Sequence, residues 1–182
     1  MRALHVFAPG LRLLLILALA VSLHGCGALP GSGDLEDEVV LTDQPVDKSQ
    51  LLSLINSYRR QNSLPALKHD PVLDEVSQKM ARHIAERDSM DTWQHSTFGL
   101  SQRLGKAKYD NYAGAENLGA GYADLTAAFR GWQGSAGHDK NLLNPYVTRV
   151  GVARTNRNTG KWRNFWVLTL ARPTSDGRPN VR

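Results

Sequence analysis

The chain has 182 residues and a formal net charge of +5, a length that fits one domain with extra segments and can bury a sizeable core. Its basic residues are mostly scattered and form no long run, so we expect no nucleic-acid groove and no nucleic-acid partner. Cys26 is the only cysteine, which excludes an intramolecular disulfide and leaves packing as the source of stability.

Residues 1–25 have the layout of an export signal. Arg2 and Arg12 supply positive charge, and the largely apolar run at 13–23 has 11 residues, too few to cross roughly 30 Å of hydrocarbon as a helix. Because a small residue and then Cys26 follow, the segment resembles a bacterial lipoprotein signal, in which Cys26 becomes the lipidated N-terminus. Lipidation would also use up a thiol that is a liability in an oxidising compartment. An ordinary secretory signal with an incidental cysteine is the alternative.

Residues 26–47 are expected to form an acidic, flexible tether that starts at the lipidated cysteine. The segment is rich in Gly, Pro and Ser and holds six acidic residues but no Lys or Arg, so self-repulsion should keep it extended. Residues 39–41 could pair as an edge strand.

Residues 48–173, in contrast, hold eighteen Lys or Arg and ten Asp or Glu, a net charge of +8. Such a domain can approach anionic lipids or acidic polymers, although a solvated basic surface explains the same composition.

The basic domain begins with a predicted helix. After Ser49, the expected N-cap, apolar residues recur at three- and four-residue spacing until Pro65 stops the helix. Asp70 followed by proline is a strong helix start, and the second helix should run to about residue 88. Shorter helices are expected at residues 100–106 and 124–132.

Three polar stretches are expected to be irregular, at residues 89–99, 109–115 and 135–146. The last of them is rich in Gly, Asn and Pro, and irregular backbone there would present His138 to solvent. Surface loops often carry binding and catalytic residues, which makes this histidine a candidate for function.

The domain ends in a predicted β-hairpin. Two apolar strands, at residues 150–153 and 165–171, flank a turn at 156–160. Because the second strand is largely apolar on both faces, helices must cover the sheet on both sides. The expected fold is therefore a three-layer α-β-α arrangement, followed by a loose C-terminal tail at residues 174–182.

Several short motifs occur in an order that resembles the CAP superfamily of cysteine-rich secretory proteins, antigen 5 and pathogenesis-related proteins. The motifs are Asn56-Ser57-Tyr58-Arg59, His95-Ser96, Glu116-Asn117-Leu118, Trp132-Gln133-Gly134-Ser135-Ala136-Gly137-His138, Asn141-Leu142-Leu143 and Val150-Gly151-Val152. The resemblance spans roughly residues 49–172 and is closest to the bacterial branch, which lacks the animal disulfides. It implies an α+β fold, the three-layer α-β-α sandwich of that superfamily, for residues 48–173.

The resemblance also implies a functional site. Members of the superfamily have a central cavity in which two histidines and acidic residues face each other, and in some members it holds a divalent metal. His95 and His138 match the two histidines, and Glu116 matches the first acid. Eukaryotic members commonly carry the second acid three residues after the tryptophan, a position taken here by Ser135. Any mechanism that needs two carboxylates is therefore in doubt.

The chemistry of these residues leaves several roles open. Two imidazoles and one carboxylate suit a zinc ion with room for a water molecule, with His95 and His138 as the predicted zinc ligands. Glu116 could instead orient a histidine. Ser135 and His138 could form a nucleophile and base, although their spacing is weak support and no third group is assigned. Finally, Glu116 and the two histidines could be a buried polar network that fixes loops over the sheet.

Three functions follow from these alternatives. The first is a lipid-anchored module that binds a lipid, glycan or protein ligand at the cell envelope. The second is a zinc-dependent hydrolase in which Glu116 handles the proton, and the third is a structural envelope protein without turnover. The missing second acid favours the first and third. The protein is expected to be exported and lipid-anchored, and Gly27 after the lipidated cysteine indicates sorting to the outer membrane in a Gram-negative host.

Overall fold

The computed structural model describes residues 38–180. The predicted signal at 1–25, Cys26 and most of the predicted tether lie outside the described residues. Within 38–180, none of the helices is both long enough and apolar enough to span a bilayer.

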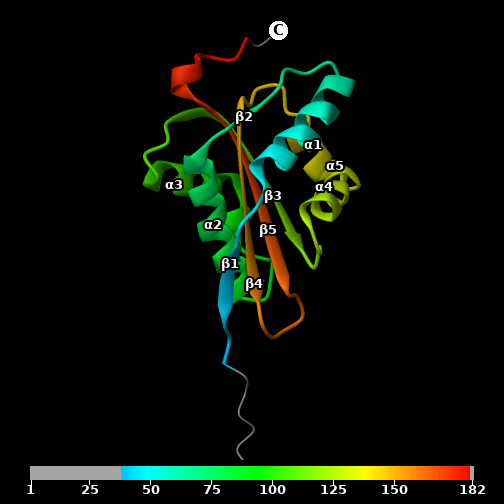
Figure 1. Ribbon diagram of the computed structural model, residues 1–182. Coiled ribbons are helices and arrows are strands. Elements are labelled where there is room, and N and C mark those ends of the chain that lie inside the picture. Colours follow the sequence, from blue (N-terminus) through cyan, green and yellow to red (C-terminus); the bar gives the residue numbers. More distant parts are fainter. Residues whose placement is uncertain (1–37, 181–182) are drawn as a thin grey trace, which may run out of the picture. The chain divides into compact units, whose positions relative to one another are not determined.

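A five-stranded sheet forms the middle layer of the domain (Figure 1). Its strand order is β1-β4-β5-β3, and β2 pairs in parallel with the start of β4, whereas the other pairs are antiparallel. The strands are β1 (Leu41–Gln44), β2 (Lys68–His69), β3 (Asn111–Ala120), β4 (Arg149–Arg157) and β5 (Asn164–Pro173). The predicted terminal hairpin is confirmed as β4 and β5.

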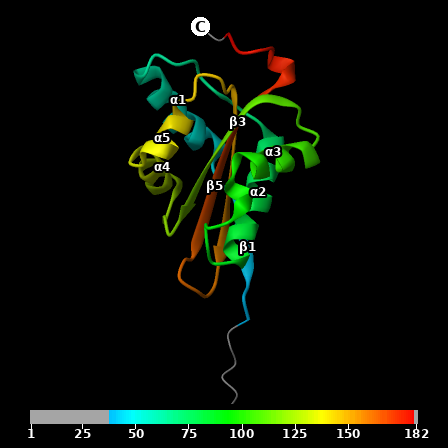
Figure 2. The same ribbon diagram turned by 180° about the vertical axis from the view of Figure 1, so that it is seen from behind.

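Helices cover both faces of this sheet (Figures 1 and 2). One face packs against α1 (Lys48–Gln61), α4 (Leu125–Gln133) and α5 (Ala136–Leu142), and the other against α2 (Pro71–Glu86) and α3 (Thr97–Lys106). Strand β5 shows why both faces are covered. Its Trp166 and Leu168 pack in the core beneath α1, α4 and α5, whereas Phe165 and Val167 pack against α2. The predicted α-β-α sandwich is confirmed. Two short 3-10 turns, η1 (Trp93–His95) and η2 (Thr174–Asp176), complete the elements.

Side-chain caps fix where the helices begin. Asp70 caps α2 with Pro71 in its first turn, and Asp124 accepts from the Ala127 N–H at the start of α4, as predicted. Helix α1 begins earlier than predicted, because the Asp47 carboxylate rather than Ser49 caps it, accepting from the N–H groups of Ser49 and Gln50 at 2.8 and 3.0 Å.

The domain boundaries differ from those expected at both ends. Residues 41–44, expected in the tether, form β1, and the Asp43 carboxylate accepts hydrogen bonds from Gln78, Arg82 and Thr155. Residues 174–176, expected in a loose tail, form the 3-10 turn η2, in which Asp176 forms an ion pair of 2.7 Å with Arg149. Charged side chains thus extend the folded domain beyond the limits that apolar periodicity suggested.

Two segments expected to be irregular are regular. Residues 111–120 form β3, paired with β5 over almost its whole length, and residues 136–142 form α5. The sequence of β3 has few β-branched residues, so its conformation comes from pairing with β5 rather than from local propensity. His138 is therefore presented by a helix rather than by irregular backbone, and Glu116 is presented by a strand.

Candidate functional site

His95 is held between two short elements. It ends η1, and the next residue, Ser96, caps α3 by accepting a hydrogen bond from the Gly99 N–H at 3.0 Å. A Cβ atom on Gly99 would lie 2.4 Å from the Gln94 carbonyl oxygen, so only glycine allows α3 to approach η1 this closely. The backbone on both sides of His95 is thereby fixed.

Glu116 is the buried centre of the site. Its side chain is 2% exposed, against 12% for Arg103 and 34% for His95. Arg103 Nη2 donates to Glu116 Oε2 at 2.9 Å, and His95 Nδ1 lies 3.1 Å from the same oxygen. Because a carboxylate only accepts, Nδ1 of His95 carries a proton. A buried carboxylate thus orients one histidine while a guanidinium balances its charge.

Arg103 is the member of this site that the sequence did not reveal. Its Nη2 also donates to the Gln94 carbonyl oxygen at 3.1 Å, which ties α3 to η1 and to β3 at once. Its Nε and Nη1, together with Glu116 Oε1, are buried without a hydrogen-bond partner in residues 38–180, although Nη2 lies 2.8 Å from Oε1. The sequence signal that could have revealed it is its position, because Arg103 lies between Leu100 and Leu104, which are buried on the same helix.

His138 approaches the site from the opposite side of β3. Burial lowers the pKa of its imidazole below the ordinary value, and the nearby positive charge of His95 lowers it further. An amide network fastens its helix to β3, because Asn117 donates to the His138 carbonyl oxygen and Asn141 donates to the Glu116 carbonyl oxygen. The two histidines and Glu116 are therefore brought into one region, as the resemblance implied.

The predicted nucleophile and base are not joined in this way. Ser135 takes the N-cap position of α5, but its hydroxyl makes no capping hydrogen bond. In the part of the chain that the structure describes, no hydrogen bond joins Ser135 to His138. Ser135 also does not line the hollow beside His95. A serine nucleophile at this position therefore has no structural support.

Two adjoining hollows lie over the site. The first, of about 220 Å³, is lined mainly by polar residues, which are His95, Ser96, Thr97, Glu116, Asn141 and Asn144; we call it the His95 cleft. The second, of about 200 Å³, includes Leu100, Leu104 and Tyr112 in its lining; we call it the Tyr112 hollow. Thr97, Leu100 and Gly114 line both, so the two are continuous.

The donor set fits a resident zinc ion poorly. Glu116 is already bound by Arg103 and His95, so a cation would have to compete with a buried guanidinium. Within residues 38–180, no group of three or more His, Cys, Asp or Glu side chains is placed to hold a metal. His95 and His138 alone are fewer than the three protein ligands usual for catalytic zinc. Zinc at these histidines stays a prediction, and Glu116 is unsuited to be its third ligand.

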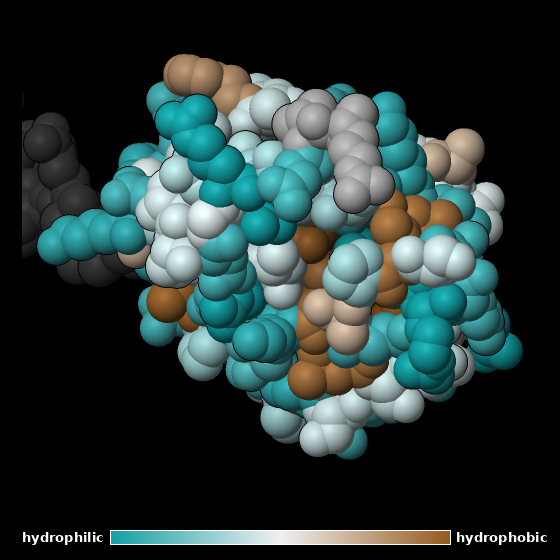
Figure 3. Space-filling view, turned by 90° about the horizontal axis from the view of Figure 1, so that it is seen from above, coloured by the Kyte–Doolittle hydropathy of each residue, from teal (hydrophilic) through white to brown (hydrophobic). Residues whose placement is uncertain are grey.

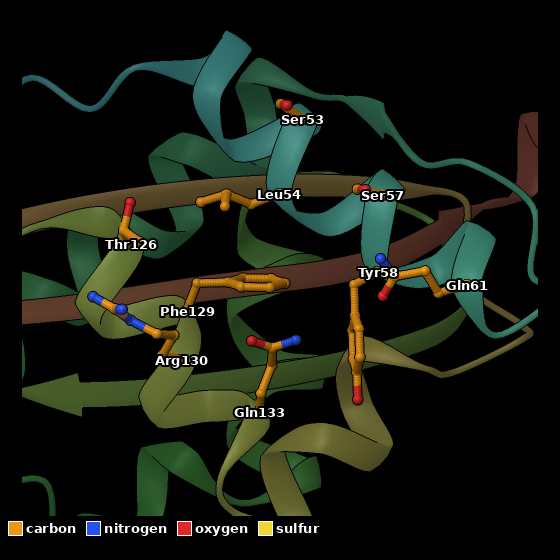
Figure 4. Close-up of a pocket in the computed structure, with 9 residues that line it drawn as sticks. All are labelled: Ser53, Leu54, Ser57, Tyr58, Gln61, Thr126, Phe129, Arg130 and Gln133. Carbon is orange, nitrogen blue, oxygen red and sulfur yellow. The ribbon is translucent and has the colours of Figure 1, made fainter.

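Another hollow lies elsewhere, between α1 and α4. This groove of about 410 Å³ is shown in Figure 4, where Ser53, Ser57 and Gln61 of α1 face residues of α4 across the buried ring of Phe129. It contains none of the predicted site residues, and we place the candidate site at His95 because Glu116, Arg103 and His95 converge there, where the resemblance implied a site. Seen from above, the domain also exposes apolar residues in a recess between hydrophilic side chains (Figure 3).

Comparisons with known proteins agree with this fold. The family model described as the cysteine-rich secretory protein family matches residues 52–170. The membrane protein YlbC of Bacillus subtilis is 30% identical over 118 residues, which are 65% of this chain and 34% of YlbC. YkwD of the same organism is 27% identical over 106 residues, or 58% of this chain and 41% of YkwD. The chain thus spans less than half the length of these relatives.

Two solved structures illustrate the likeness. An extracellular protein with an SCP domain from Bacillus anthracis is 30% identical, with a TM-score of 0.57, over 68% of this chain and 39% of that one. An outer surface protein of Borrelia burgdorferi has a TM-score of 0.62 at 22% identity, over 74% of this chain and 99% of that one, which supports the fold alone. Because the family model covers more than half of the sequence, the chain belongs to the CAP family of cysteine-rich secretory proteins.

Proposed function

We propose that this chain is an exported CAP-domain protein that binds a ligand in the His95 cleft and is anchored to a membrane by a lipid on Cys26. Export is supported by two relatives, a membrane protein and an extracellular protein. The anchor is supported by the sequence of residues 1–26. The ligand is a lipid, a glycan or a protein segment.

The arrangement of Glu116 carries the binding proposal. Glu116 is buried, paired with Arg103 and hydrogen-bonded to His95, so taking a proton from a reacting water would break up a buried ion pair, which favours recognition over hydrolysis. The lining of the cleft is able to hydrogen-bond, through side chains that include those of His95, Thr97 and Asn144. Polar groups fixed on rigid elements before a ligand arrives reduce the entropy cost of binding.

The test uses paired histidine variants of the full-length protein. Peptidoglycan fragments, synthetic peptides and phospholipid vesicles are screened by their effect on the melting temperature, and positive hits are followed by calorimetry. His95→Ala should abolish the stabilisation by the true ligand. His69→Ala is the matched control, because His69 is 27% exposed, close to the 34% of His95, and pairs with Asp74 away from the cleft. Equal stabilisation of both variants by every hit would refute the assignment of the cleft.

A further inference from the structure

Strand β3 is the last strand of the sheet and pairs only with β5. The N–H of Gly121 bonds to the Asn164 carbonyl oxygen across that pair, which sets the alternation of inward- and outward-facing backbone groups along β3. In agreement, the Leu118 carbonyl oxygen accepts from Trp132 Nε1 at 2.9 Å and the Glu116 carbonyl oxygen from Asn141 Nδ2 at 3.1 Å. The same alternation points the N–H and C=O of Gly114 away from β5.

The rest of this edge is closed. Trp132 of α4 and Asn141 of α5 cover Leu118 and Glu116, and a bulge interrupts the register between Asn111 and Ala113 at the other end. Among the hydrogen bonds that residues 38–180 form, none outside the sheet involves Gly114. A short window of unpaired backbone is therefore left open at Gly114.

Gly114 lies where the His95 cleft joins the Tyr112 hollow. A Cβ atom there would lie 3.4 Å from Leu100 Cδ2 and from Leu104 Cδ1, an ordinary contact, and its φ is not positive. The fold therefore does not require glycine at this position, although glycine in a strand costs stability. Glycine in a strand interior often marks the close approach of a ligand or of another backbone.

An unpaired amide edge is complementary to another peptide backbone. Side chains two residues apart in an added strand project to the same side about 7 Å apart, a spacing that suits two adjoining hollows. The exposed charges around the Tyr112 end are mainly positive. Arg178 lies 5.7 Å from the centre of the Tyr112 ring, and Lys106 and Lys108 accompany one acid, Asp110, between α3 and β3.

We propose that an extended acidic segment of a protein partner adds to β3 as a short strand at Gly114. One side chain of this segment enters the polar His95 cleft, and the side chain two residues further along enters the more apolar Tyr112 hollow. The acidic residues meet the basic surface around Tyr112. This inference rests on the proposed function, since both use the His95 cleft, and it specifies the ligand as a polypeptide.

The chain's own acidic residues 34–37 are a poor occupant, because of where they join the domain. Leu41 of β1 pairs with Arg157 near the hairpin turn, whereas Gly114 pairs with Ala171, opposite Arg149 at the far end of β4. Eight residues of β4 separate these positions, about 26 Å along the strand, and two further strands lie between β1 and β3. Residue 37 is four residues from Leu41 and reaches about 14 Å when fully extended.

The experiment screens the full-length protein in detergent micelles against a library of all-L decapeptides with acidic flanks, and measures the best binder by fluorescence anisotropy. Methylating the peptide nitrogen that faces Gly114 should weaken binding about tenfold, because it removes one hydrogen bond between the peptide backbone and the Gly114 carbonyl oxygen. Gly114→Val should have a similar effect. Gly105→Val, at a position with open space around it in α3, should leave the affinity within about twofold. Slower hydrogen exchange of the Gly114 N–H in the complex is the direct readout.

The outcomes separate this inference from the proposed function. If His95→Ala weakens binding but neither Gly114→Val nor peptide methylation does, the cleft binds peptide without strand addition, and the inference is refuted alone. If a glycan fragment binds through His95 while no library peptide binds more tightly than about 1 mM, the polypeptide assignment is wrong. If Gly114→Val converts a dimer of the protein into a monomer without peptide, the edge serves a second copy instead. If His95→Ala affects no ligand, both proposals fail.

Discussion

Replacing Arg103 with methionine tests the centre of the site. The change keeps the length and apolar volume of the side chain but removes the guanidinium, leaving Glu116, 2% exposed, with only His95 as a charge partner. Breaking a buried ion pair by removing one partner typically costs about 3–5 kcal/mol. For a domain of this size such a loss lowers the melting temperature by roughly 10 °C or more. Chemical denaturation at pH 7.5 measures the free energy of unfolding directly.

A surface pair supplies the control for this experiment. Arg82 lies 2.8 Å from Asp43, but the side chains are 46% and 35% exposed, so Arg82→Met should cost about 1 kcal/mol or less. If Arg103→Met costs no more than Arg82→Met at pH 7.5, Glu116 is solvated in solution and the argument for a charge-balanced site is refuted.

Three further predictions concern His138, zinc and the anchor. Because burial and His95 lower the pKa of His138 in the folded state, the unfolded chain takes up this proton first, and stability should fall as the pH drops below about 6.5. In His138→Gln that loss should be smaller in unfolding curves measured against pH. Arg103→Met should bind zinc more tightly than the wild type in equilibrium dialysis, because Glu116 becomes available as a ligand. Cys26→Ser should move the protein from the membrane fraction to the soluble fraction, and continued retention would contradict lipidation.

Much of the fold could be predicted because its signals are local. Asp70 followed by proline and Asp124 before an apolar stripe both mark helix starts through their own hydrogen-bonding chemistry, and both are confirmed. Because apolar residues of β5 lie on both faces of the strand, helices had to cover the sheet on both sides. Strand β3 was missed for the opposite reason, since its glycines and alanines favour no extended state and only β5 selects it.

The candidate site was only partly predictable. His95, Glu116 and His138 could be named from motifs, and the structure brings them together in one region. Arg103 could not, because a single basic residue on a helix usually indicates a solvated face, and only the packing of α3 on η1 turns it inward. Ser135 begins α5 close to His138 in the chain, but the hydrogen bond expected between them is not formed in the described residues. Side-chain partners across elements are what sequence alone does not contain.

The position of β1 has a mechanical consequence. The strand lies antiparallel to β4, and all four of its residues pair with β4, while the Asp43 carboxylate ties it to α2. A pull on the chain at Glu38, directed along β1, loads these pairs and the Asp43 contacts together, in shear, rather than one after another as in unzipping. A domain fastened to a membrane through this strand would therefore resist tension between its anchor and a partner bound at the opposite edge of the sheet.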